Sequence, residues 1–108
     1  MTITYKVCGQ LNPAATTLST LYTVPGSTQT IVSTLSVCNQ GVSTTYRVAV
    51  RPAGATLDPK HYIIYENPLN ANTSVLLTLG LTLAATDVVS VYAGTANVSF
   101  NLFGSELS

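Results

Sequence analysis

The sequence of 108 residues carries four acidic and four basic side chains, so only 7% of its residues are charged, whereas an average soluble domain has about 25%. The net charge is zero. This excludes an electrostatic nucleic-acid binder and a polybasic membrane anchor, because both need clustered Lys and Arg. With 46% hydrophobic residues, the chain has enough apolar surface to fold, and its length predicts one domain, residues 1–108.

Apolar and polar residues alternate with a period of two along the chain, which predicts β-strands separated by turns. Turn residues such as Pro25-Gly26-Ser27 and Pro52-Ala53-Gly54 end two of them. We expect Gly9 to end the first strand and Asn67-Pro68 to close the fifth. In chain order, the eight predicted strands lie at residues 3–7, 18–24, 31–37, 45–51, 61–65, 75–83, 88–93 and 98–102.

Two of these strands have patterns that predict a core-facing side. Ile31, Leu35 and Val37 are predicted to share the inward face of the third strand. In the sixth strand, alternate residues from Val75 to Leu83 are all apolar. We therefore expect this strand to cross the core.

The strand pattern also predicts the fold class. No window of 11 or more residues has a helical apolar stripe. Parallel strands would need crossovers of a dozen or more residues, for which the chain has no room. The sequence therefore predicts an all-β protein: a single antiparallel β-sandwich of about eight strands, immunoglobulin-like or jelly-roll-like.

The N-terminal segment and the two cysteines indicate the cellular compartment in which the chain folds. Residues 1–7 alternate polar and apolar side chains and lack the continuous apolar segment of a signal peptide, so we expect folding in a cytoplasm. There Cys8 and Cys38 are expected to be free thiols, although the sequence leaves open whether they come within bonding distance. Two cysteines without His or Cys neighbours do not make a four-ligand zinc site, and we expect no metal and no cofactor.

Candidate catalytic residues are few. Asp58 and His61 are close in sequence, but one acid and one imidazole without a positioned nucleophile are more typical of a solvated turn that precedes a strand. The sequence has no nucleophile-elbow, phosphate-loop or metalloprotease motif. We expect no enzymatic activity, no catalytic residues and no small-molecule substrate.

Four residues are candidates for a binding surface. Arg47 and Arg51 fall on the same outward face of the fourth strand. Two interpretations are open: they anchor a protein interface, or they are two solubilising charges on a solvent-facing strand. Tyr62 and Tyr65, together with Tyr46, are compatible with stacking on a sugar ring, although tyrosines in a sandwich more often pack in the core or against a strand. A surface poor in charge is suited to burial against other protein, so we infer an assembly subunit.

The sequence resembles small virion structural proteins of tailed bacteriophages, cyanophages among them. The stretches that carry the resemblance are TLYTVP at 20–25, IVSTLSVCNQG at 31–41, YRVAVRPAG at 46–54, LGLTLAATDVVSVYA at 79–93 and FNLFGSE at 100–106. They are strand and turn signatures, and they supply no site residues.

The resemblance implies a non-enzymatic component of the virion, made in the cytoplasm of the infected bacterium. Its implied partners are other copies of itself, as a trimer, and the major capsid protein or a tail protein. We favour a capsid cement protein, which decorates the shell at symmetry axes, because 108 residues leave no room for a fibre shaft. The alternatives are a tail, fibre or baseplate accessory protein and, more remotely, a carbohydrate-binding module.

Overall fold

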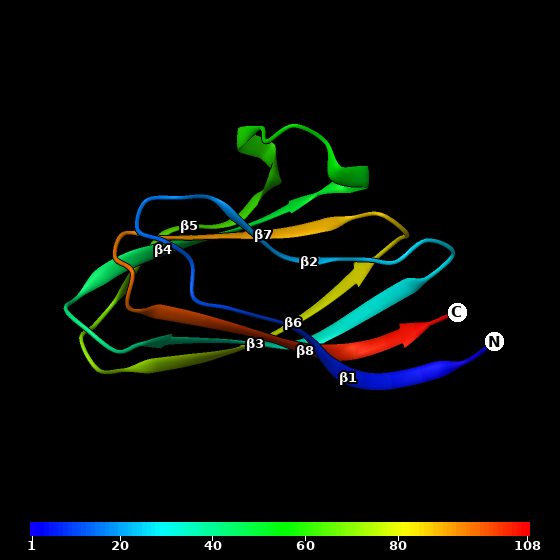
Figure 1. Ribbon diagram of the computed structural model, residues 1–108, viewed down its shortest axis with the longest axis horizontal. Coiled ribbons are helices and arrows are strands. Elements are labelled where there is room, and N and C mark those ends of the chain that lie inside the picture. The colour runs from blue at the N-terminus through cyan, green and yellow to red at the C-terminus, as the bar shows by residue number, and fades with distance from the viewer.

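The computed structural model describes residues 1–108 as two four-stranded antiparallel sheets packed face to face (Figure 1). The first sheet has the strand order β1-β8-β3-β6 and the second has the order β2-β7-β4-β5. The strands are β1 (Ile3–Leu11), β2 (Ser19–Thr23), β3 (Gln29–Asn39), β4 (Thr44–Arg51), β5 (Tyr62–Leu69), β6 (Ser74–Leu83), β7 (Val88–Ala93) and β8 (Val98–Leu107). Two short 3-10 turns, Pro52–Gly54 and Pro59–His61, lie between β4 and β5. The predicted all-β sandwich of about eight strands is confirmed.

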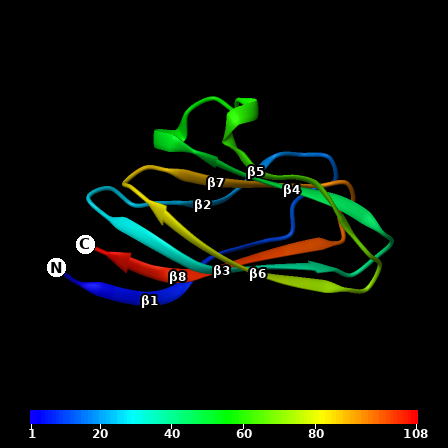
Figure 2. The ribbon, with the colours of Figure 1, turned by 180° about the vertical axis from the view of Figure 1, so that it is seen from behind.

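The strand order identifies the sandwich as a jelly roll. All connections except β4 to β5 cross from one sheet to the other, and strands far apart in sequence, such as β1 with β8 and β2 with β7, are paired. Eight strands wound into two sheets in this way are the jelly-roll arrangement. The immunoglobulin-like arrangement has a different strand order. The chain ends lie side by side at one end of the sandwich, as Figures 1 and 2 show.

The core lies between the sheets. Phe100 and Leu102 of β8 are fully buried, and they face Tyr46 and Val48 of β4. The rings of Tyr46 and Phe100 meet edge to face with centroids 6.3 Å apart. Alternate residues of β4 and β8 therefore supply the centre of the core.

The predicted inward face of the third strand is wrong at one residue. Ile31 is 46% exposed, whereas Val32 is fully buried. The pairing of β3 with β8 shifts between Val32 and Thr34, so Ser33 is an extra residue in β3. A bulge of this kind reverses the alternation, and Leu35 and Val37 then point inward as predicted.

Two predicted strand ends are also corrected. β1 continues through Gly9 to Leu11, with a register shift between Val7 and Gly9. β5 continues through Asn67-Pro68 to Leu69, which Pro68 permits because β5 is an edge strand. The predicted apolar side of the sixth strand faces the core, with Leu83 buried and Val75, Leu77, Leu79 and Leu81 half-buried against it. These residues are only half-buried because β6 is the edge strand of its sheet.

Cys8 and Cys38 are both free thiols. They lie on β1 and β3, and β8 runs between these two strands. Burial raises the pKa of the Cys8 thiol. The structure contains no helix long and apolar enough to cross a membrane.

Candidate interaction site

Three of the four predicted interface residues meet on the outer face of the second sheet. The Arg47 guanidinium carbon lies 4.5 Å from the centroid of the Tyr65 ring and 5.9 Å from that of Tyr62. A third ring comes from Tyr92, which the sequence analysis did not single out. Tyr92 lies on β7, the strand that pairs with β4 on the side opposite β5, and its ring centroid is 4.1 Å from the Arg47 guanidinium carbon. We call Arg47, Tyr62, Tyr65, Glu66 and Tyr92 the Arg47 cluster.

Irregular pairing of β5 explains why both of its tyrosines are in the cluster. In a regular strand, residues three apart point to opposite faces. The pairing of β4 with β5 shifts twice, between Tyr46 and Val48 and between Val48 and Ala49, and each shift gives β5 an extra residue. Tyr62 and Tyr65 thereby reach the same face, where their rings pack edge to face with centroids 5.0 Å apart. The irregularity opposite Tyr46 and Val48 includes Glu66, whose φ is 49°.

Glu66 neutralises and orients the arginine. Arg47 Nη2 donates to Glu66 Oε1 at 2.8 Å, and Thr45 Oγ1 donates to Glu66 Oε2 at 2.7 Å. The hydrogen bond to Glu66 raises the pKa of Arg47, and the hydrogen bond from Arg47 lowers the pKa of Glu66. Arg47 Nε is buried without a hydrogen-bond partner. The guanidinium is therefore fixed between aromatic rings and a carboxylate.

Arg51 lies on the same face but acts locally. Its Nε donates to Ser90 Oγ at 3.1 Å, and its Nη1 donates to the carbonyl oxygen of Ala55 at 2.9 Å. These bonds tie the segment between β4 and β5 to the outside of the second sheet, where Figure 1 shows it. Arg51 thus supports the rim of the site and does not contact the aromatic rings.

Two other candidates are occupied by structural contacts. Asp58 Oδ1 accepts from the Lys60 N–H at 3.1 Å, and His61 Nδ1 accepts from the Asp58 N–H at 3.0 Å, so this pair caps a turn. Tyr46 is fully buried, and its hydroxyl accepts from Asn67 Nδ2 at 2.8 Å. Tyr46 therefore has no surface to offer to a sugar.

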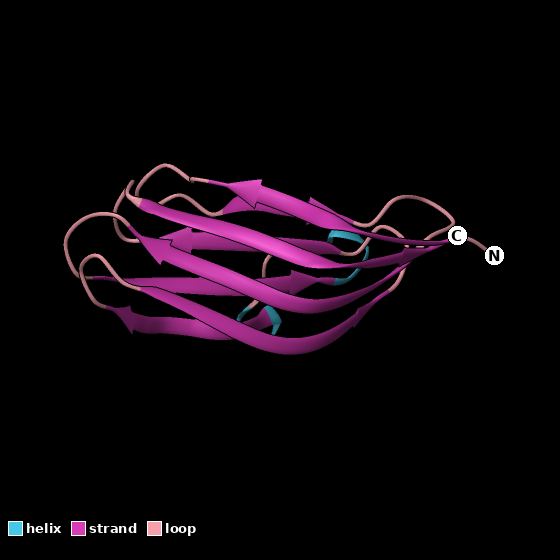
Figure 3. Ribbon diagram, turned by 90° about the horizontal axis from the view of Figure 1, so that it is seen from below, coloured by secondary structure: helices cyan, strands magenta, loops and turns pink.

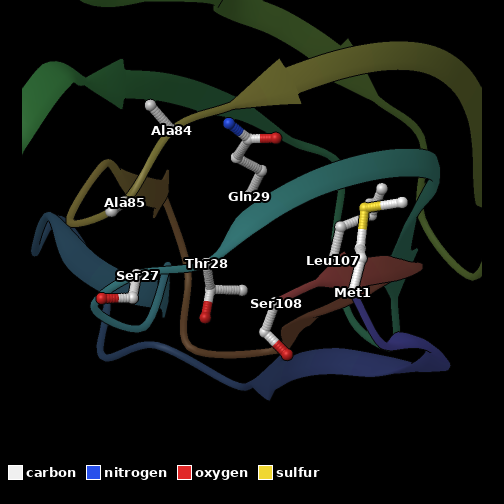
Figure 4. A pocket seen from close by; sticks show the side chains of 8 residues that line it. All are labelled: Met1, Ser27, Thr28, Gln29, Ala84, Ala85, Leu107 and Ser108. Atoms are coloured by element: carbon white, nitrogen blue, oxygen red, sulfur yellow. The ribbon is translucent and has the colours of Figure 1, made fainter.

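A hollow of about 460 Å³ is lined by Arg47, Pro59, Tyr62 and Tyr65. Tyr65 is 60% exposed at its rim. A larger hollow of about 510 Å³ lies at the end of the sandwich where the chain termini meet two turns, and Figure 4 shows its lining. None of the side chains around the larger hollow is an acid or a base. The smaller hollow, in contrast, has a guanidinium lying over two tyrosine rings.

Sequence reasoning missed three residues around the hollow: Thr45, Glu66 and Tyr92. Thr45 shares the outward alternation of Arg47 and was recognisable on that basis. Glu66 reaches the site only because of the irregular β5 pairing, and Tyr92 only because β7 pairs with β4. No group of three or more His, Cys, Asp or Glu side chains is arranged to hold a metal ion.

No protein-family model and no curated protein matches the sequence. Among solved structures, the chain is similar to a chain in the structure of infectious bursal disease virus, Gx strain, with a TM-score of 0.55 and 13% sequence identity. The match covers 97% of this chain and 32% of the viral one, so this chain spans about a third of the viral chain's length. At this identity the likeness shows a shared fold.

Proposed function

We propose that this chain is a non-enzymatic structural subunit of a virus particle, and specifically a capsid cement protein of a tailed bacteriophage. The observation that carries the proposal is the Arg47 cluster, held rigid on the outer face of a jelly-roll sheet. The fold shared with a chain of infectious bursal disease virus supports a virion role. The sequence resemblance to phage virion proteins supports a tailed bacteriophage as the source of the particle.

The cluster has the chemistry of a protein-docking surface. Tyr and Arg are enriched among the residues that contribute most to protein–protein affinity. Arg47 and Glu66 neutralise one another, so a partner does not have to supply a counter-charge. Because the rings and the guanidinium are already packed together, binding would fix few additional rotamers. We infer that Tyr65 and Arg47 contact the major capsid protein.

The hydrogen bonds made by the acidic side chains support a non-enzymatic role. Asp87 accepts from the N–H groups of Ala53 and Ala84, at 2.9 and 2.8 Å. Asp58 caps a turn, and Glu106 accepts from the Tyr22 hydroxyl. Each of these carboxylates is held by a structural hydrogen bond.

A compact shape favours the shell over the tail. The molecule measures 44 × 27 × 19 Å and all of its strands belong to the two sheets. A decoration protein of this form can lie flat on a shell at a symmetry axis. A tail or baseplate accessory protein is the alternative, and both places put the chain in the virion, after its synthesis in the host cytoplasm.

Binding of the purified chain to virus particles that lack it tests the proposal. We expect co-sedimentation of the wild type, and at least a tenfold loss of affinity for Tyr65→Ala and for Arg47→Glu, the scale typical of central interface residues. Val42→Ala changes a side chain that is 67% exposed in the turn between β3 and β4, and serves as the control. Binding of folded Tyr65→Ala and Arg47→Glu at wild-type affinity would refute the assignment of the cluster.

The exposed ring of Tyr65 beside Glu66 also fits a sugar, which stacks on aromatic rings and donates hydroxyls to carboxylates. A glycan array separates this second candidate from the first. Glycan binding that is lost in Tyr62→Ala and Tyr65→Ala would favour a carbohydrate-binding module. Glycan binding that survives both changes would exclude the aromatic platform, and no binding at all would exclude the class.

A further inference from the structure

The outer face of the first sheet, on the opposite side of the sandwich, has exposed apolar side chains on three of its four strands. Tyr5 on β1 is 83% exposed, Leu76 on β6 is 69% exposed and Ile31 on β3 is 46% exposed. A hollow of about 360 Å³ lies between β1 and β3, and its lining includes Tyr5, Lys6, Ile31 and Phe103. Figure 3 views the molecule from this side. Large apolar side chains grouped in this way mark an interaction surface.

The charged side chains of the first sheet alternate away from this face, and Lys6 borders its hollow. The first sheet contains only two charged residues, Lys6 and Glu106. Glu106 accepts from the hydroxyl of Tyr22, which belongs to the second sheet, and Lys6 Nζ lies 3.5 Å from Glu106 Oε1. The other charged side chains are on β4, on β5 and in the connecting turns. We call this surface the uncharged face.

We propose that the uncharged face binds the uncharged face of a second copy of this chain. A surface without charge cannot compensate a partner's charge, and burying an unpaired charge is costly. A matching partner must therefore be uncharged over the same area. The outer face of the second sheet, with Arg47 and Arg51, does not meet this condition, whereas the uncharged face of another copy does. Hydroxyls of Ser33 and Ser105 beside the apolar residues can donate to and accept from their counterparts.

The available area is sufficient for a stable contact. The outer face of the first sheet, seen in Figure 3, spans the longest and the shortest dimension of the molecule, 44 × 19 Å. A face of that outline offers about 800 Å², which matches the roughly 800 Å² that each partner buries in a standard protein interface. A contact made by the same patch on both copies is closed by a two-fold axis.

This inference deepens the proposed function and rests on it, because it assigns the contact between copies to one face and leaves the Arg47 cluster on the other face to bind the particle. Sedimentation velocity and light scattering of the purified full chain test it. We expect a mass of two chains, and at least a tenfold weaker association for Ile31→Lys and for Leu76→Lys. Val42→Lys adds the same charge in a turn and should leave the mass unchanged.

Leu76 is on an edge strand and 69% exposed, so its substitution tests the contact even where Ile31→Lys fails to fold. Circular dichroism checks the fold of each variant. A wild type that stays monomeric at millimolar concentration, or a folded Leu76→Lys that associates like the wild type, would overturn the inference. Tyr65→Ala separates the two proposals, because we expect this variant to associate normally and to lose particle binding. Self-association and particle binding are therefore tested independently of one another.

Discussion

Arg47 lies against the ring of Tyr65, with its guanidinium carbon 4.5 Å from the ring centroid, although the pairing that brings these two residues together is irregular. Tyr62 supports Tyr65 from the side, at an interplanar angle of 76°. Tyr92 holds the guanidinium from the neighbouring strand. The site is therefore assembled before any partner arrives.

Replacement of Arg47 by Lys tests the geometry of the cluster at constant charge. We expect Arg47→Lys to lower the free energy of unfolding by about 1 kcal/mol, because an ammonium group loses the planar contact with the rings and the fixed bond to Glu66. Urea denaturation measures the change. Lys60→Arg, in an exposed turn, is the control for the exchange of one cation for another. Equal stability of wild type and Arg47→Lys would show that the stacking contributes nothing.

Acid titration tests the Arg47–Glu66 pair. The hydrogen bond from Arg47 lowers the pKa of Glu66 in the folded state. The pair therefore stabilises the fold above the ordinary glutamate pKa of about 4.3, and this stabilisation is lost as the pH falls through the lowered value. Melting temperatures of wild type and Glu66→Gln should differ at neutral pH and converge in acid. A difference that does not depend on pH would contradict the assigned ionisation.

Alkaline titration tests the contact between the sheets at Tyr22. Burial and the hydrogen bond to Glu106 raise the pKa of Tyr22, so the neutral phenol stabilises the fold below its ordinary pKa of about 10. That contribution is lost as the pH rises through the raised value. Tyr22→Phe should be less stable by about 1 kcal/mol at neutral pH and should lose less stability than wild type on the alkaline side. Parallel alkaline curves for the two proteins would count against this contact.

Gly104 tests the pairing of β3 with β8. A Cβ at this position would lie 2.2 Å from the carbonyl oxygen of Ile31 and 3.0 Å from Cα of Val32. Because both are backbone atoms, Gly104→Ala must displace β3, and we expect a loss of at least about 2 kcal/mol in unfolding free energy. Gly26→Ala is the matched control, since nothing lies within 4 Å of its Cβ. Equal denaturation midpoints for the two variants would refute the tight approach of the strands.

The sequence predicted the fold class because the alternation of apolar residues is a local signal. Val98, Phe100 and Leu102 point inward as their spacing predicts. The sandwich type needed the order of the strands, which depends on pairings between residues as distant as Ile3 and Leu107. One extra residue, Ser33, was enough to expose Ile31, because a bulge has no sequence signature as clear as alternation.

The candidate site was predicted in part for the same reason. Arg47 was placed outward by simple alternation, and the structure agrees. Tyr62 and Tyr65 were chosen by residue type, whereas their shared face depends on two register shifts in β5. Glu66 and Tyr92 are joined to the site by long-range pairing, which no single window of sequence contains. The uncharged face required the strand order of the first sheet as well.

The location of the chain on the virus particle tests the central claim most directly. Electron cryo-microscopy of particles from the virus that encodes this chain should show a jelly roll of this size on the outside of the shell, with the Arg47 cluster against the major capsid protein and the uncharged faces of neighbouring copies in contact. Density for the chain on the tail alone would contradict the cement assignment, and particles without the chain would contradict the virion role.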